Sequence, residues 1–259
     1  MRYLLILLLC TVVLVSCQEE YVYPSVVTEF IDARTNGEGK LTWLITDQGD
    51  TLDIQERSGL DGLCADSTYR TITIYEHLEE EASQTYPMVR VYSVQQILSI
   101  SPVDKNNFSP GEISTDPLDI QSIWRSGNYL NLILLPLVKE GKHIYMAVET
   151  ELTRHSDGHQ TLSLILHHDR NGDEEAFTRK TYLSIPLSTY KGKLQEGDLV
   201  RVYSSDNQYL ATGHYQIGSI AVRILTFEDE EIGYSFWLQR ITAAYHMRRA
   251  IGLTTSICV

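Results

Sequence analysis

Short stretches of alternating apolar and polar residues are the feature that most constrains the fold of this chain. They are rich in β-branched and aromatic residues, and turn-forming segments such as Thr35-Asn36-Gly37-Glu38-Gly39 and Asp47-Gln48-Gly49-Asp50 separate them. A period of two that is bounded by Gly, Asn and Asp indicates half-buried β-strands. The sequence therefore predicts an all-β protein.

The predicted strands fall into two groups on either side of Ser101 to Pro117, a polar, Pro-containing segment that we interpret as a linker or a domain edge. The first group has the size and strand count of a small barrel or sandwich. The spacing of the second group predicts an antiparallel β-sandwich. The predicted strands lie at residues 26–31, 40–46, 51–55, 69–75 and 88–94, and then at 119–125, 129–138, 143–152, 161–168, 176–186 and 199–203.

The N-terminus has the layout of an export signal. Arg2 precedes an almost unbroken apolar run from Tyr3 to Val15, which is shorter than the roughly 20 residues that a membrane-spanning helix needs. The run ends in Leu14-Val15-Ser16-Cys17, which looks like the lipobox of bacterial lipoproteins. We therefore expect cleavage before Cys17, diacylglycerol on its thiol and acyl lipid on the same residue, which together form a stable membrane anchor.

The residues that follow the expected cleavage site bear on where the protein resides. Gln18-Glu19-Glu20 resembles the acidic export signal of surface lipoproteins in Bacteroidota, although short acidic runs are also common in solvated tethers. We expect a lipid anchor in the outer membrane and favour the cell surface over the periplasmic face. The expected organisation is a signal peptide at residues 1–16, a tether at 17–24, a barrel at 25–112, a sandwich at 117–225 and a partly helical tail at 226–259.

Charge and cysteine content narrow the chemistry. The formal net charge is −13 at pH 7, whereas binding to nucleic acid or anionic lipid headgroups requires a basic face. We therefore expect a protein, peptide or glycan partner and no nucleic acid. Cys10 leaves with the signal and Cys17 carries the lipid, so Cys64 and Cys258 remain. We expect both to be free thiols, with one bridge between them as the alternative.

The segment from Asp169 to Glu175 is the most suggestive cluster of polar residues. Oxygen ligands for Ca²⁺ could come from four alternating side chains, Asp169, Asn171, Asp173 and Glu175. The segment departs from the EF-hand loop, because glycine stands at its fourth place and Lys180 at its twelfth. The favoured alternative is a turn at Asn171-Gly172 with acidic residues at its rim.

The sequence contains no motif for catalysis. His155 and His159 are separated by a predicted turn, and no third ligand follows at a matching spacing. His167 and His168 are adjacent on a predicted strand and so point to opposite faces. The Gly-x-Ser-x-Gly and His-Glu-x-x-His patterns are absent. We expect a non-enzymatic binding protein without catalytic residues. The alternatives are a secreted metal-dependent hydrolase and a structural component of an outer-membrane assembly.

Several segments together resemble the NigD-like lipoproteins of Bacteroidota in order and spacing. The resemblance covers about Tyr21 to Val202 and implies an N-terminal OB-fold domain, a C-terminal β-sandwich and a role linked to bacteriocin operons and immunity. It carries no active site to transfer. Residues 203–259 depart from the family pattern. Either a divergent extension or a frameshifted end would explain this departure. The segments are Tyr21-Val22-Tyr23-Pro24-Ser25-Val26-Val27-Thr28-Glu29-Phe30, Leu44-Ile45-Thr46-Asp47, Ile123-Trp124-Arg125-Ser126-Gly127-Asn128-Tyr129-Leu130, His168-Asp169-Arg170-Asn171-Gly172-Asp173 and Tyr182-Leu183-Ser184-Ile185-Pro186-Leu187.

Overall fold

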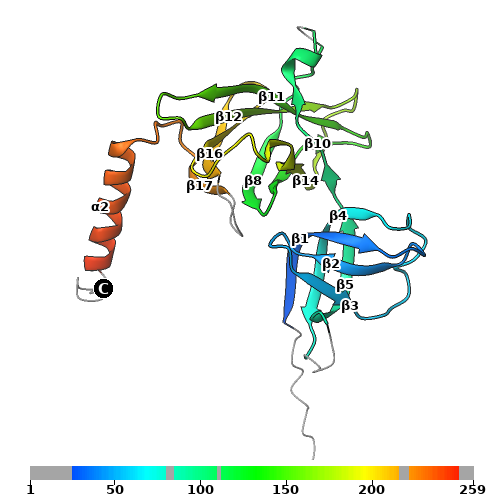
Figure 1. Ribbon diagram of the computed structural model, residues 1–259. Coiled ribbons are helices and arrows are strands. Elements are labelled where there is room, and N and C mark those ends of the chain that lie inside the picture. The colour runs from blue at the N-terminus through cyan, green and yellow to red at the C-terminus, as the bar shows by residue number, and fades with distance from the viewer. Residues whose placement is uncertain (1–24, 80–84, 110–111, 216–221, 251–259) are drawn as a thin grey trace, which may run out of the picture.

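The computed structural model describes residues 25–79, 85–109, 112–215 and 222–250, with the backbone alone for 222–224. These residues form a closed barrel, a two-sheet sandwich and a C-terminal helix (Figure 1). The predicted mostly β fold and the partly helical tail are confirmed. Cys17 and Cys258 lie outside the described residues, whereas Cys64 is an exposed free thiol. In the described part of the chain, no helix has the length and apolar character needed to cross a bilayer.

The N-terminal barrel closes with its strands in the order β1-β2-β3-β5-β4, which confirms the predicted OB-like barrel. Alternation places Ile31, Ala33, Leu44 and Val89 in its interior, where their side chains are fully buried. β1 is long enough to pair with both β2 and β4, and this closes the barrel. The strands are β1 (Val26–Thr35), β2 (Leu41–Ile45), β3 (Thr51–Ile54), β4 (Thr68–His77) and β5 (Met88–Gln96).

The C-terminal sandwich consists of a four-stranded and a six-stranded sheet. The first has the order β6-β14-β9-β8 and the second β17-β16-β15-β12-β11-β7, while β10 and β13 form a separate pair. The strands are β6 (Leu98–Ser99), β7 (Val103–Asp104), β8 (Asp119–Ser126), β9 (Tyr129–Leu135), β10 (Leu137–Val138), β11 (Ile144–Arg154), β12 (Gln160–Asp169), β13 (Phe177–Thr178), β14 (Thr181–Pro186), β15 (Leu199–Ser204), β16 (Tyr209–Tyr215) and β17 (Val222–Thr226).

The sandwich differs in two details from the pattern expected from the sequence. It is mostly antiparallel, but β15 lies parallel to β12. Between these two strands the chain crosses to the other sheet, where it forms β14, and then returns. The segment interpreted as a linker also contributes to the sandwich, since β7 lies within it and pairs with β11. Just before this segment, β6 pairs with β14. The last barrel strand ends at Gln96, so the expected barrel boundary at residue 112 lies beyond it.

The interior of the sandwich is an aliphatic core between its two sheets. Leu132, Leu164, Ile185 and Val202 come from strands on both sheets and are at most 2 % exposed. Two short 3₁₀ helices, η1 (Lys105–Asn107) and η2 (Ser188–Tyr190), lie in the connections. Tyr190 of η2 is fully buried, and its hydroxyl donates to Glu149 at 2.9 Å. The core thus extends over the loop that follows β14.

Arg70 on β4 joins the barrel to the four-stranded sheet. Its guanidinium forms a bidentate ion pair with Asp47, at 2.5 and 2.9 Å, and a third contact with Asp32 at 3.2 Å. On the sandwich side it donates to Ser184 and Asn131, which are fully buried. The Tyr129 ring lies 3.8 Å from its central carbon. One buried cation therefore connects five partners across two domains.

Gly127, in the turn between β8 and β9, lies against the β2–β3 turn of the barrel. It has a φ of +51°, and an added Cβ would lie 2.1 Å from the Asp47 carbonyl oxygen. We expect Gly127→Ala to lower the free energy of unfolding by about 1–3 kcal/mol, because the domains must move apart to relieve the clash. Chemical denaturation measures this. Gly172→Ala, which also has a positive φ but open space around it, is the control, and an equal loss would contradict the close domain contact.

Helix α2 (Tyr234–Ala250) follows β17 and projects from the sandwich (Figure 1). Phe236 in its first turn is buried, and the adjacent Trp237 ring lies 6.0 Å from the ring of His214 on β16. Arg240 contacts Glu230 at 3.4 Å. These contacts hold only the beginning of the helix against the sandwich.

Candidate functional site

In the acidic turn, where the sequence favours a plain turn over a calcium site, Asp169 and Glu175 each use an oxygen atom in a local contact. Asn171 and Gly172 both have positive φ, and Asp169 accepts a hydrogen bond from the Asn171 backbone N–H at 2.6 Å. Glu175 pairs with Arg170 at 2.8 Å. Among the described residues, no group of three or more His, Cys, Asp or Glu side chains is placed to hold a metal ion. The calcium site stays a prediction.

Asp173, the third of these candidates, is part of a buried polar network. Burial alone would raise the pKa of its carboxyl, but hydrogen bonds from the backbone N–H groups of residues 139–141 and from His143 outweigh burial and lower the pKa to about 2. His143 Nδ1 lies 2.8 Å from His168 Nε2, and His168 Nδ1 lies 2.9 Å from the Pro117 carbonyl oxygen. Burial, together with the nearby His143, lowers the pKa of His168. The network joins three segments of the sandwich.

We expect Asp173→Asn to reduce stability at neutral pH and to flatten its acid dependence. A carboxyl whose pKa is lower in the folded chain stabilises it above the unfolded pKa of 3.8, and this contribution is lost as pH falls toward about 2. Thermal unfolding between pH 2 and 7 should show the gap between wild type and variant closing at low pH. The exposed Glu174→Gln variant is the control. A gap that stays constant from pH 7 to 2 would contradict this assignment.

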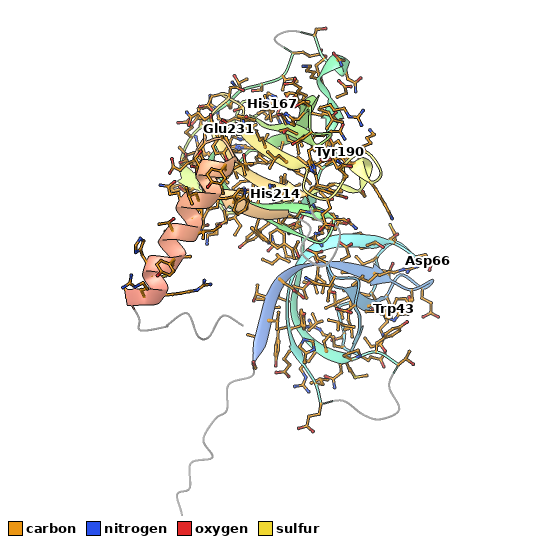
Figure 2. All side chains as sticks on the ribbon, turned by 60° about the vertical axis from the view of Figure 1, so that its left-hand side comes forward. Trp43, Asp66, His167, Tyr190, His214 and Glu231 are labelled. Carbon is orange, nitrogen blue, oxygen red and sulfur yellow. The ribbon has the colours of Figure 1, made fainter. Side chains whose placement is uncertain are left out.

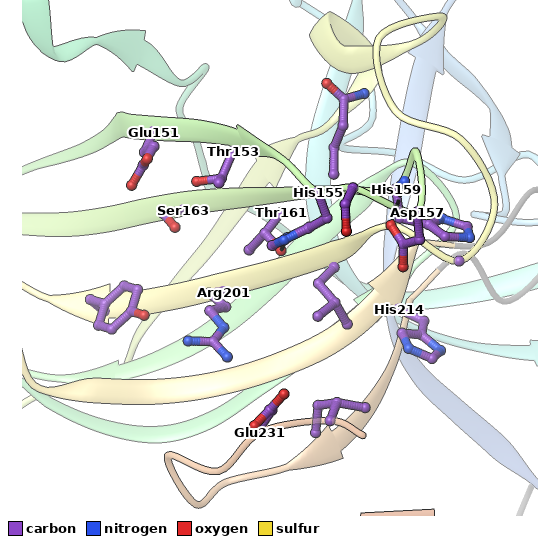
Figure 3. Close-up of a pocket in the computed structure, with 16 residues that line it drawn as sticks. Glu151, Thr153, His155, Asp157, His159, Thr161, Ser163, Arg201, His214 and Glu231 are labelled. Atoms are coloured by element: carbon purple, nitrogen blue, oxygen red, sulfur yellow. Dashed lines mark hydrogen bonds between the residues drawn. The ribbon is translucent and has the colours of Figure 1, made fainter. Parts of the chain in front are cut away.

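A polar groove of about 780 Å³ lies on the outer face of the six-stranded sheet. Alternation along the strands directs Glu151 and Thr153 of β11, Thr161 and Ser163 of β12, and Arg201 of β15 into it (Figure 3). The turn at residues 155–159 lies at one end. Glu231, just before α2, lies at the opposite side from β11 (Figure 3), and Ile232 also lines the groove. The groove thus combines hydroxyl groups, a guanidinium and carboxylates in one extended strip.

Arg201 provides a cationic group with spare hydrogen-bonding capacity in the middle of this strip (Figure 3). Its side chain is 28 % exposed, and its Nη1 lies 4.0 Å from the Asp229 carboxylate, which is too far for a direct hydrogen bond. Its Nε is buried without a hydrogen-bond partner among the described residues. A bound acceptor could therefore take hydrogen bonds from Arg201 without displacing a close ion pair.

The histidines at the turn end are held by specific partners. His159 Nδ1 lies 3.2 Å from Asp198, a fully buried carboxylate that also accepts from the backbone N–H groups of Gln160 and Gln195. His155 Nε2 lies 2.7 Å from the Thr161 hydroxyl. Burial, together with the nearby His159, lowers the pKa of His214, so this side chain is neutral near pH 7. Figure 2 shows His214 and Glu231 on the side of the sandwich next to α2.

This arrangement suits recognition of a polar ligand. A Thr–His contact also occurs in hydrolytic sites, where a carboxylate orients the histidine, but within the described part of the chain no carboxylate contacts His155. Sequence reasoning noted His155 and His159 yet missed Arg201, His214 and Asp198. Arg201 and His214 face the groove from the neighbouring strands β15 and β16, and the alternation within 199–203 could have placed Arg201 there. Asp198 is fully buried just before β15.

The sandwich matches a known family model. Residues 99–212 match the NigD-like C-terminal β-sandwich domain. This match includes β11, β12 and β15, which carry most of the groove, and it ends before β17 and α2. No curated protein matches the sequence.

Several solved structures share the two-domain fold. A NigD-like immunity protein from Bacteroides caccae is 28 % identical, with a TM-score of 0.57, over 78 % of this chain and 94 % of that chain. A protein of unknown function from Bacteroides vulgatus is 20 % identical, with a TM-score of 0.57, over 74 % and 91 %. A toxin-related protein from Parabacteroides distasonis is 16 % identical, with a TM-score of 0.53, over 74 % and 92 %. The last two share the fold alone.

Proposed function

We propose that this chain, as a member of the NigD-like family, is a lipid-anchored envelope protein that protects the cell by binding a toxin or shielding its target, without catalysing a reaction. The observation that carries the proposal is the polar groove on the outer face of the six-stranded sheet, most of which lies within the domain that matches the family. The similarity to an immunity protein supplies the biological context. The lipobox at Cys17 supplies the expected anchor, with the outer membrane as its location and the cell surface favoured.

The groove chemistry supports a polar, extended partner. Thr153, Thr161 and Ser163 offer hydroxyl groups along the strip, while Glu151 and Arg201 offer opposite charges. A segment of a protein, a peptide or a glycan presents hydrogen-bond donors and acceptors in such a row. When such a ligand displaces water from the groove, its polar groups can pair with those of the groove. The overall acidity of the chain disfavours nucleic acid at this site.

Site-specific photo-crosslinking in intact cells tests this proposal. A benzoylphenylalanine at Thr153 reports on the groove, and the same group at Tyr86, an exposed barrel residue, is the matched control. Cells are exposed to culture supernatants from competing strains. We expect an adduct of defined mass at position 153, absent at position 86 and absent without supernatant. Adducts of equal yield at both positions would contradict binding in the groove, and fragments of a captured peptide would favour a hydrolase.

A further inference from the structure

Helix α2 presents a row of four apolar side chains to solvent, and Trp237 and Met247 are exposed at other positions around the helix. Exposed fractions are 82 % for Tyr234, 50 % for Leu238, 65 % for Ile241 and 44 % for Tyr245. Phe236 is the one buried residue of the helix. Contiguous exposed apolar surface on a folded protein usually marks an interaction site. The contacts within the chain leave this face of α2 without a described partner.

The spacing of these four residues matches the seam of a two-helix coiled coil. Successive steps of four, three and four residues place their side chains in one narrow row, as at the apolar heptad positions. The helix has 17 residues, so it is about 26 Å long, and the row occupies most of this length. A narrow row fits another helix better than it fits a broad flat surface.

The charges at the two ends of the helix are opposite in sign. Arg248 and Arg249 lie in its last turn, and the helix itself contains no acidic residue. The segment that leads into the first turn carries Glu228, Asp229, Glu230 and Glu231. Glu230 already pairs with Arg240, whereas the other three are largely free for intermolecular contacts, with only the 4.0 Å approach of Asp229 to Arg201. The helix therefore has a basic end and an acidic end.

We propose that two copies of this chain associate through α2, with the helices antiparallel and related by a two-fold axis. In this arrangement Leu238 of each copy faces Ile241 of the other, and Tyr234 faces Tyr245. Arg248 and Arg249 of each copy lie near the acidic segment of its partner. The same patch then serves both subunits, as an isologous interface requires. The family-matched sandwich remains outside this interface, and the groove adjoins the interface at Glu231.

A second copy fits this face better than an anionic membrane surface does. The acidic segment at residues 228–231 adjoins the apolar row, and the whole chain has a net charge of −13. An anionic bilayer would repel both. An antiparallel copy of α2 places the basic end of each helix next to the acidic segment of the other copy.

Sedimentation equilibrium of residues 18–259, which contain every described strand and helix, tests the apolar row. We expect a monomer–dimer equilibrium at protein concentrations of about 1–100 µM, the range in which an interface with a micromolar dissociation constant populates both species. Ile241→Asp should raise the dissociation constant at least about tenfold. Ala243→Asp is the matched control, because it adds the same charge at an exposed position on the opposite side of the helix, and it should dimerise like wild type.

Charge reversal tests the antiparallel orientation. Arg248→Glu combined with Arg249→Glu should weaken the dimer, and adding Glu228→Arg and Glu231→Arg should restore it. Wild-type protein that stays monomeric at the highest concentration would overturn the proposal. Equal dimerisation of Ile241→Asp would also overturn it. Flotation of wild type, but not Ile241→Asp, with phosphatidylglycerol vesicles in the absence of dimers would make a membrane the occupant instead.

Discussion

Replacement of Arg70 by Met is expected to lower the free energy of unfolding by about 3–5 kcal/mol, because the change removes one partner of a buried ion pair and leaves the other charged. The side chains of Arg70 and Asp47 are 2 % and 3 % exposed. Burial alone would lower the pKa of Arg70, but the hydrogen bonds and charges of Asp47 and Asp32 outweigh it and raise the pKa. The variant would also leave the Ser184 hydroxyl and Asn131 without their shared donor.

Urea denaturation of residues 18–259, followed by tryptophan fluorescence, measures this loss. The control is Arg90→Met, since Arg90 forms a surface ion pair with Glu76 and its side chain is 48 % exposed. Such a pair contributes only about 0–1 kcal/mol. Because Arg70 joins both domains, its loss should also separate the unfolding of the barrel from that of the sandwich. A loss no larger than that of Arg90→Met would contradict its structural role.

Replacement of Cys17 by Ala is expected to release the protein from the membrane fraction almost completely. The thiol is the proposed attachment point of the lipid, and several acyl chains bind a bilayer far more strongly than a soluble acidic domain does. Metabolic labelling with a palmitate analogue should mark wild type and leave the variant unmarked. Protease treatment of intact cells should degrade the wild-type protein if it is displayed on the surface, with lysed cells as the control. A variant that sediments with membranes like wild type would contradict the anchor.

The fold could be predicted well from the sequence because apolar and polar residues alternate along a strand as its side chains alternate between the core and the solvent. In β12 and β15, buried and partly exposed residues alternate almost strictly, and such strands are recognisable without their partners. Sheet membership was harder to predict. β6 and β7 contain two residues each, too few for a period, and their pairing with distant strands depends on the whole sandwich.

The groove and the domain contact were harder to predict because they depend on pairing between strands far apart in the sequence. Arg201 meets Glu151 and Glu231 in one groove only because β15 lies beside β12, through a crossover that no local pattern records. Asp47 was interpreted as part of a turn, and it is one, but its contact with Arg70 depends on barrel closure. The candidate calcium ligands show the converse, since spacing alone suggested convergence, whereas Asp169 and Asp173 accept hydrogen bonds from backbone N–H groups.

A survival assay in the native host tests the central claim most directly. A strain that lacks the gene is complemented with wild type, Cys17→Ala, Arg201→Glu or Lys139→Glu, each at equal protein level, and challenged with culture supernatants from competing strains. Lys139 is exposed and lies outside the groove, so its charge reversal is the matched control. We predict that wild type and Lys139→Glu restore survival, whereas Cys17→Ala and Arg201→Glu do not. Equal survival of all strains, with or without the gene, under every challenge would contradict an immunity function.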